Sequence, residues 1–96
     1  MPVFDVEEHL ALQRLVQIAK RDTGQSTRVA NFLLSWWDAE SCGGFDPTDL
    51  WTLDEGIVAD VFLVLQLISK NRGKHPDKFE LSDEFEAIIA QHRSPP

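Results

Sequence analysis

Apolar residues recur every three or four positions in four stretches of this chain, a spacing typical of α-helices that bury one face. The first predicted helix covers Val6 to Lys20. Asp5 is placed to cap its start, and Gly24 is placed to stop it. The second predicted helix begins after a cap at Ser26 or Thr27.

The third predicted helix begins at a capping box, Thr52 to Glu55, and runs to about Asn71. Because it is apolar around most of its circumference, it is expected either among neighbouring helices or in an oligomer interface, and we place it at the centre. A short helical turn starting at Asp46-Pro47 precedes it, and Ser82 caps a fourth helix. No segment alternates like a strand, so we expect an all-α fold: a compact bundle of about four helices with one extra short helical turn.

The second helix ends near Ala39 and carries two neighbouring tryptophans. Trp36 and Trp37 point about 100° apart around the helix axis, so we expect one indole to face the core and the other to cover its edge. In the loop before the fourth helix, Phe79 and Leu81 are expected to pack back onto the core.

The length of 96 residues, with 43% hydrophobic content, predicts one domain over residues 1–96, of which 93–96 form a frayed tail. Cys42 is the only cysteine, which excludes an intramolecular disulfide and fits a reducing compartment. The N-terminus lacks the parts of a signal peptide, and the longest apolar run, Ile57 to Ile68, is far shorter than the roughly 20 residues of a membrane span. We therefore expect a soluble, cytoplasmic protein.

The net charge of −7 is placed unevenly along the chain. No Lys or Arg lies between Arg28 and Lys70, whereas outside this interval nine acids balance nine bases. A surface that binds nucleic-acid phosphates would need the opposite sign, so direct nucleic-acid binding is not expected. The seven acids of the interval are Asp38, Glu40, Asp46, Asp49, Asp54, Glu55 and Asp60.

No residue pattern indicates catalysis, a cofactor or a metal. The three histidines are far apart in the chain, and none is spaced from Cys42 or from another histidine as zinc ligands are. Cys42 has no neighbouring base in sequence to activate it as a nucleophile. Asp46, Asp49 and Asp54 lack the alternating oxygen ligands of a calcium loop, and helix capping accounts for Asp46. The histidines are His9, His75 and His92.

Trp51 lies between two capping signals in the acid-rich connection, where an exposed position and burial are both open. The acids around it have two interpretations as well: a solvated face, or a surface complementary to a basic partner. An aromatic side chain surrounded by charge is the usual composition of a binding hot spot. We therefore take Trp51 and the seven acids as candidate protein-binding residues.

The runs Trp36-Trp37-Asp38-Ala39-Glu40, Cys42-Gly43-Gly44-Phe45-Asp46 and Thr48-Asp49-Leu50-Trp51 resemble a family of short uncharacterised bacterial proteins. That family is carried largely by plasmids, phages and other mobile elements, and it implies no activity or catalytic residue for this chain. In size, charge and setting the chain is also similar in type to anti-CRISPR proteins, which implies occupation of a basic nucleic-acid groove in a host complex.

These observations support three hypotheses. The first is an inhibitor or regulator that docks its acids and Trp51 on a basic surface of a nucleic-acid-handling host complex. The second is a helical assembly module, such as a homodimer, that uses surplus apolar surface around Leu63 and Leu67. The third, an enzyme that uses Cys42 or the acid cluster, is the weakest, and we expect a protein that is not an enzyme.

Overall fold

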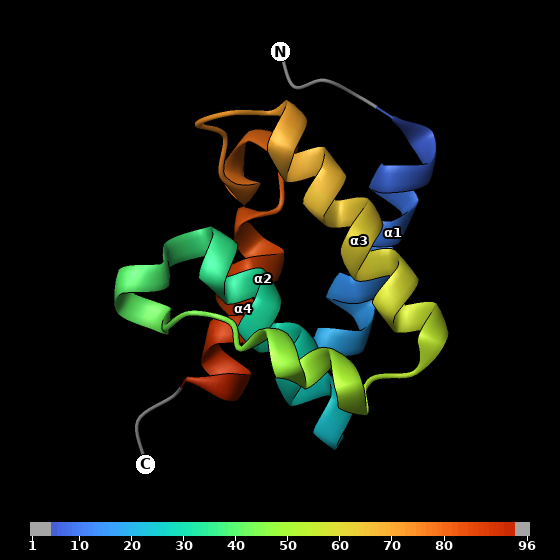
Figure 1. Cartoon of the computed structure of the whole chain (residues 1–96). Coiled ribbons are helices and arrows are strands. Elements are labelled where there is room, and N and C mark those ends of the chain that lie inside the picture. The colour runs from blue at the N-terminus through green and yellow to red at the C-terminus, as the bar shows by residue number, and fades with distance from the viewer. Residues whose placement is uncertain (1–4, 94–96) are drawn as a thin grey trace.

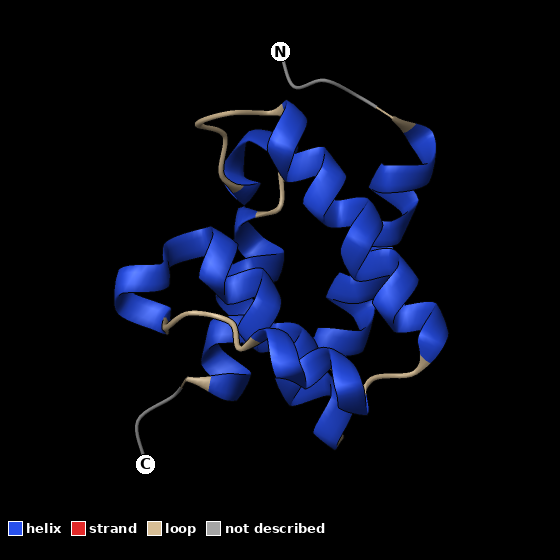
Figure 2. Cartoon of the chain, viewed as in Figure 1, coloured by secondary structure: helices blue, strands red, loops and turns tan. Residues whose placement is uncertain are grey.

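The computed structural model describes residues 5–93, which form four α-helices and two short 3-10 turns and contain no strand (Figures 1 and 2). The predicted all-α fold is confirmed. The elements in chain order are α1 (Val6–Ala19), α2 (Gly24–Cys42), η1 (Pro47–Thr52), α3 (Glu55–Lys70), η2 (Pro76–Phe79) and α4 (Ser82–His92).

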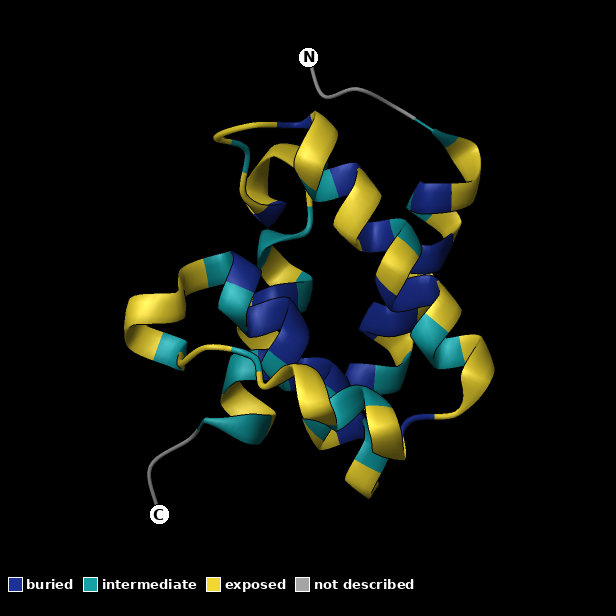
Figure 3. Ribbon diagram, viewed as in Figure 1, coloured by how far each residue is buried: buried dark blue, intermediate teal, exposed yellow. Residues whose placement is uncertain are grey.

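The helix at the centre of the bundle is not α3. Helix α1 packs on both α2 and α3, and α4 lies against α2 (Figure 1). Helix α3 is shorter than α2 and buries only one face, and Figure 3 shows exposed residues along the side turned away from α1. The central position predicted from its composition is therefore wrong. The fully buried residues of the core include Leu12, Leu15, Leu33, Leu34, Val61, Val64, Phe85 and Ile88.

Helix α2 begins earlier than the sequence predicts. Thr23 is its cap, because the Thr23 hydroxyl oxygen accepts a hydrogen bond from the Ser26 N–H at 3.0 Å. Gly24 is therefore the first residue of α2 and does not stop α1, which ends at Ala19. Ser26 is buried within the first turn of α2. The cap of α1 at Asp5 is confirmed, since its carboxylate accepts from the Glu8 N–H at 3.1 Å.

The capping box predicted at the start of α3 does not form. The Thr52 hydroxyl instead donates to the Asp49 carbonyl at 3.0 Å. The Asp54 N–H donates to Oε1 of Gln25 at 2.8 Å, and Nε2 of Gln25 donates to the Asp54 carboxylate at 3.2 Å. A side chain 29 residues away in sequence thus stabilises this helix start. At α4 the residue in the cap position is Leu81, and Ser82 is already helical.

The two neighbouring tryptophans of α2 divide as the sequence predicts. Trp36 is buried against Phe79 and Phe85, with ring centroids 5.7 and 6.2 Å away, and its Nε1–H donates to the Lys74 carbonyl at 3.2 Å. Trp37 is half-buried and stacks on Phe85 at 5.4 Å. The aromatic contacts join the C-terminal half of α2 to η2 and α4, and the packing of Phe79 onto the core is confirmed.

The C-terminal end of the described chain is tied to α2. Arg93 donates from Nε to the Cys42 carbonyl at 3.1 Å and from Nη2 to the Asn31 side chain. Arg93 is therefore not part of a frayed tail, and residues 94–96 lie outside the described residues. Among residues 5–93, no helix has the length and apolar content needed to cross a membrane.

Candidate protein-binding site

The segment between α2 and α3 is built from two local signals. Helix α2 ends at Cys42 and is followed by Gly43, whose φ of +94° lies in the region that favours glycine. Asp46 then caps η1: its carboxylate accepts from the Thr48 N–H at 2.9 Å and from the Thr48 hydroxyl at 2.8 Å. These hydrogen bonds, the backbone one first, lower the pKa of Asp46. Pro47 occupies the first position of the turn, which confirms the predicted short helical turn.

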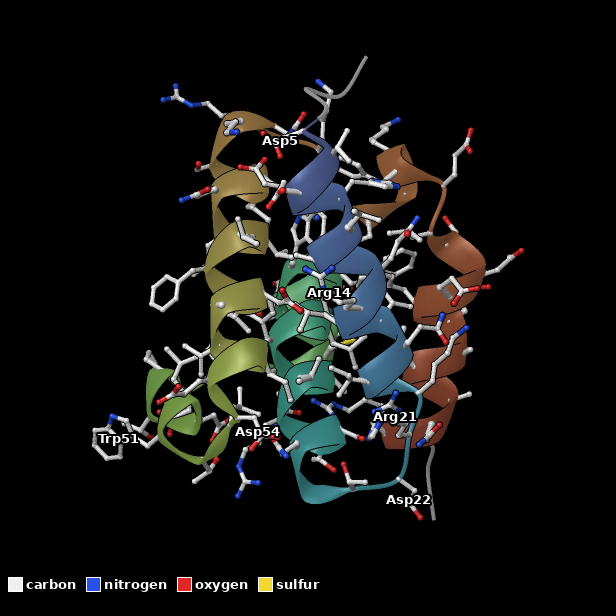
Figure 4. The ribbon with its side chains drawn as sticks, turned by 90° about the vertical axis from the view of Figure 1, so that its right-hand side faces the viewer. Asp5, Arg14, Arg21, Asp22, Trp51 and Asp54 are labelled. Atoms are coloured by element: carbon white, nitrogen blue, oxygen red, sulfur yellow. The ribbon has the colours of Figure 1, made fainter. Side chains whose placement is uncertain are left out.

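Trp51 projects from η1 into solvent and is 83% exposed, which decides between the two positions left open by the sequence. Its neighbours in the turn point the other way, since Leu50 and Leu53 pack on the core. Figure 4 shows the Trp51 indole pointing away from the bundle, at the end of the molecule where α3 begins. The turn is thus held by its leucines and presents the indole outward.

Four of the seven candidate acids lie in the same short segment as Trp51. Asp49 is half-buried and 3.8 Å from the Arg28 guanidinium, and Asp54 is held by Gln25. Glu55 is exposed at the first position of α3, where the helix dipole favours an anion. We call residues 46–55 the acidic connection; its candidate residues are Asp46, Asp49, Trp51, Asp54 and Glu55.

The other three acids lie elsewhere. Asp38 lies at a kink in α2 and Glu40 lies just beyond it, and both are exposed. This end of α2 turns away from the acidic connection in Figure 1. Asp60 is 8% exposed and accepts two hydrogen bonds from Arg14, at 2.9 and 2.8 Å. Asp60 therefore joins α3 to α1 and is not part of a binding surface. The hydrogen bonds to Asp60 raise the pKa of Arg14.

The surplus apolar surface of α3 is not where the sequence analysis placed it. Leu67 is buried and Leu63 is half-buried, so neither is the exposed apolar residue of this helix. Phe62 and Leu65 are 53% and 42% exposed instead. The sequence contained the information to find them, because each residue of an α-helix is turned by about 100° from the one before it. On this basis Phe62 lies opposite the buried residues Val64 and Leu67, on the face that carries Gln66 and Ser69.

Two of the three histidines donate hydrogen bonds to backbone carbonyls of α2 and α1. His75 donates from Nδ1 to the Trp36 carbonyl at 2.8 Å, and His92 donates from Nε2 to the Ala19 carbonyl at 2.6 Å. Cys42 is half-buried at the end of α2. Within the described range 5–93, no three His, Cys, Asp or Glu side chains gather in a way that could hold a metal ion.

Residues 9–93 match a protein family that is described as a family of unknown function, DUF7673. The chain belongs to this family. The comparisons with curated proteins and with solved structures give no match. The matched range of DUF7673 includes the whole acidic connection and all of α2 and α3, so the candidate site lies within the part of the chain that defines the family.

Proposed function

We propose that this protein is a small acidic protein-binding module, an inhibitor or regulator, which docks its acidic connection on a basic surface of a partner protein. The observation that carries the proposal is the exposure of Trp51, 83%, among Asp46, Asp54 and Glu55. An indole that the core does not use gives the free protein no packing energy, whereas it can fill a partner's pocket. Asp46 caps η1 and Asp54 binds Gln25, yet all three acidic side chains are exposed and add negative charge to the segment that presents the indole.

The charges and the indole have separate roles in this proposal. The acids draw a Lys- and Arg-lined surface toward the connection and orient it, which acts mainly on the association rate. Trp51 then acts as the buried anchor, which acts mainly on the dissociation rate. A partner that normally binds nucleic acid offers such a basic surface. A host complex whose nucleic-acid groove is occupied by this protein is the specific form that we propose, by analogy in type with anti-CRISPR proteins.

The test is capture of partners from bacterial lysate by the tagged protein, followed by binding kinetics with the purified partner. We expect Trp51→Ala to weaken the affinity about 30-fold, the effect of a hot-spot residue of about 2 kcal/mol. We expect Glu55→Lys to slow association, with a smaller effect as the ionic strength rises.

Glu86→Lys is the matched control, because Glu86 is exposed on α4 and the substitution changes the net charge by the same amount as Glu55→Lys. Equal effects of Glu55→Lys and Glu86→Lys would mean that only the total charge matters. A partner whose affinity is unchanged by Trp51→Ala would exclude the acidic connection as the docking surface.

The local field around Trp51 can be measured without a partner. Fluorescence quenching distinguishes this exposed indole from buried Trp36 and half-buried Trp37. Because the acids attract cations and repel anions, the ratio of caesium to iodide quenching is expected to be higher for the accessible indole than for a free neutral tryptophan derivative at equal ionic strength. Glu55→Lys should reduce this ratio. A caesium-to-iodide ratio equal to that of the free derivative would show that the acids do not set the potential at Trp51.

A further inference from the structure

The outward face of α3 carries an apolar strip that the fold does not use. Phe62 is 53% exposed and Leu65 is 42% exposed, and half-buried Val58 lies on the same side of the helix. This helix is also the one whose apolar content is too high for a helix with a solvated face. The other side of α3 packs on α1 through Val61, Val64 and Leu67, among other residues. The other exposed residues of this outward face are Glu55, Ala59, Gln66 and Ser69.

Opposite charges lie at the two ends of α3, at equal distances from its midpoint beside Phe62. Helix α3 starts at Glu55 and ends at Lys70, so its midpoint falls between positions 62 and 63. Both end residues are exposed, and Lys70 already contacts Glu8 at 2.8 Å. An ammonium group has three donors and can therefore hold a second carboxylate. The face is thus acidic at one end, apolar in the middle and basic at the other end.

We propose that the outward face of α3 binds the same face of a second copy of this chain, with the two helices antiparallel and a two-fold axis beside Phe62. This arrangement places Glu55 of each copy opposite Lys70 of the other, so the two charged ends satisfy each other. It also aligns the helix dipoles favourably, since each N-terminus lies next to a C-terminus. A parallel arrangement would put like charges together at both ends.

The side chains between the charged ends fit the same register. A two-fold axis between positions 62 and 63 places each residue opposite the residue of the other copy that lies equally far on the other side of this midpoint. Ala59 therefore faces Gln66, and the two Phe62 rings lie side by side at the axis. Val58 and Leu65 lie on one side of Phe62 on the helical wheel and come close to each other across the axis. A small residue therefore faces a larger one on one side, and two aliphatic residues meet on the other.

The contact is a single helix pair, which is smaller than a standard protein interface, and the dimer is therefore weak. The inference does not rest on the proposed function, because its central contact at Phe62 lies outside the acidic connection. Glu55 belongs to both surfaces, so Phe62→Ser is the variant that tests the dimer alone and Trp51→Ala the variant that tests the docking surface alone. The dimer does have a consequence for that function. In an antiparallel dimer the two acidic connections lie at opposite ends of the helix pair, so a dimer would present two docking surfaces, each with Trp51 and the acids other than Glu55.

The first experiment is sedimentation equilibrium from about 10 µM to about 1 mM, a range suited to interfaces below standard size. We expect a monomer–dimer equilibrium whose dissociation constant rises at least about tenfold in Phe62→Ser, because the central aromatic contact is lost. Glu55→Lys should also raise it, whereas Glu86→Lys should not. Phe62 is exposed, so its loss leaves the fold intact, which the far-ultraviolet circular dichroism of the variant checks. A monomer throughout this range would overturn the proposal and leave the face to another protein.

Disulfide cross-linking tests the antiparallel register directly, in a Cys42→Ser background. Ala59→Cys and Gln66→Cys are both at exposed positions. Across the proposed axis these two positions face each other, whereas two copies of the same position are offset by about 10 Å along the helix, beyond the reach of a disulfide. We expect a mixture of the two variants to form a disulfide-linked dimer and each variant alone to form no disulfide under mild oxidation. Equal cross-linking of a single variant with itself would overturn the antiparallel arrangement.

Discussion

The surroundings of Trp36 and of Trp51 show two uses of the same side chain in one small protein. Around Trp36, two phenylalanine rings and a backbone carbonyl take up both the apolar surface and the indole N–H. Around Trp51, the neighbouring leucines turn inward and the indole remains 83% exposed. The difference shows that not every tryptophan of this chain belongs to the core. Trp51, which lies outside the core, is the one available to a partner.

The acids divide in the same way. Asp60 is buried and bound by Arg14 through two hydrogen bonds, so its charge is used to join α3 to α1. Glu55, five residues earlier, is exposed at the start of the same helix. The net charge that the sequence concentrates in one interval is therefore partly structural, because Asp60 is used between two helices while Glu55 stays exposed.

The largest expected effect is on the core tryptophan. Trp36→Ala should lower the free energy of unfolding by about 3–5 kcal/mol, because it removes a large buried ring and leaves a cavity beside Phe85. Trp51→Ala should change it by less than about 0.5 kcal/mol, as for a surface substitution. Chemical denaturation of the two variants measures both values. A large loss of stability in Trp51→Ala would show that the indole supports the fold, and the comparison between the two regions would fail.

A smaller difference is expected between the two acids of α3. Asp60→Ala removes the hydrogen bonds from Arg14, and we expect a loss of about 1–2 kcal/mol, at the lower end for a charged pair because the Arg14 side chain is 53% exposed. Glu55→Ala should change the free energy of unfolding by less than about 0.5 kcal/mol. Double substitution of Asp60 and Arg14 by leucine and methionine is the control, because apolar side chains of similar size remove the pair without leaving a buried charge. Similar losses in Asp60→Ala and Glu55→Ala would show that the pair contributes no more than a surface charge.

Local signals explain which elements the sequence predicted well. The four helices, the cap at Asp5 and the short turn after Asp46 follow from the spacing of apolar residues and from side chains within three positions of the backbone they bind. Helix α3 begins at Glu55, within the predicted stretch Thr52 to Glu55, but its capping was missed because the partner is Gln25, far away in sequence. No local rule identifies such a partner. The central position of α3 was wrong for a related reason, since composition does not say how many neighbours a helix has.

The candidate site was predictable only in part. The acidic connection follows from chain proximity, because Asp46, Trp51 and Glu55 lie within one turn and the start of one helix. The exclusion of Asp60 required the packing of α3 on α1, which brings Arg14 to it across 46 positions of the sequence. The exposure of Phe62 and Leu65 was hidden by the same apolar content that suggested a buried helix.

The smallest expected effect concerns the cap of η1 at low pH. The hydrogen bonds from Thr48 lower the pKa of Asp46 in the folded protein, so the carboxylate form is favoured by folding. Its contribution to stability is therefore fully present above the unfolded value of about 3.9 and is lost as the pH falls through the lower folded value. Asp46→Asn keeps a capping oxygen that does not titrate, so the stability of the wild type relative to this variant should fall between about pH 4 and pH 2. Thermal unfolding of both proteins measures this difference, in which the titration of the other carboxylates cancels. A difference that stays constant from pH 6 to pH 2 would mean that the Asp46 cap does not hold the turn that presents Trp51.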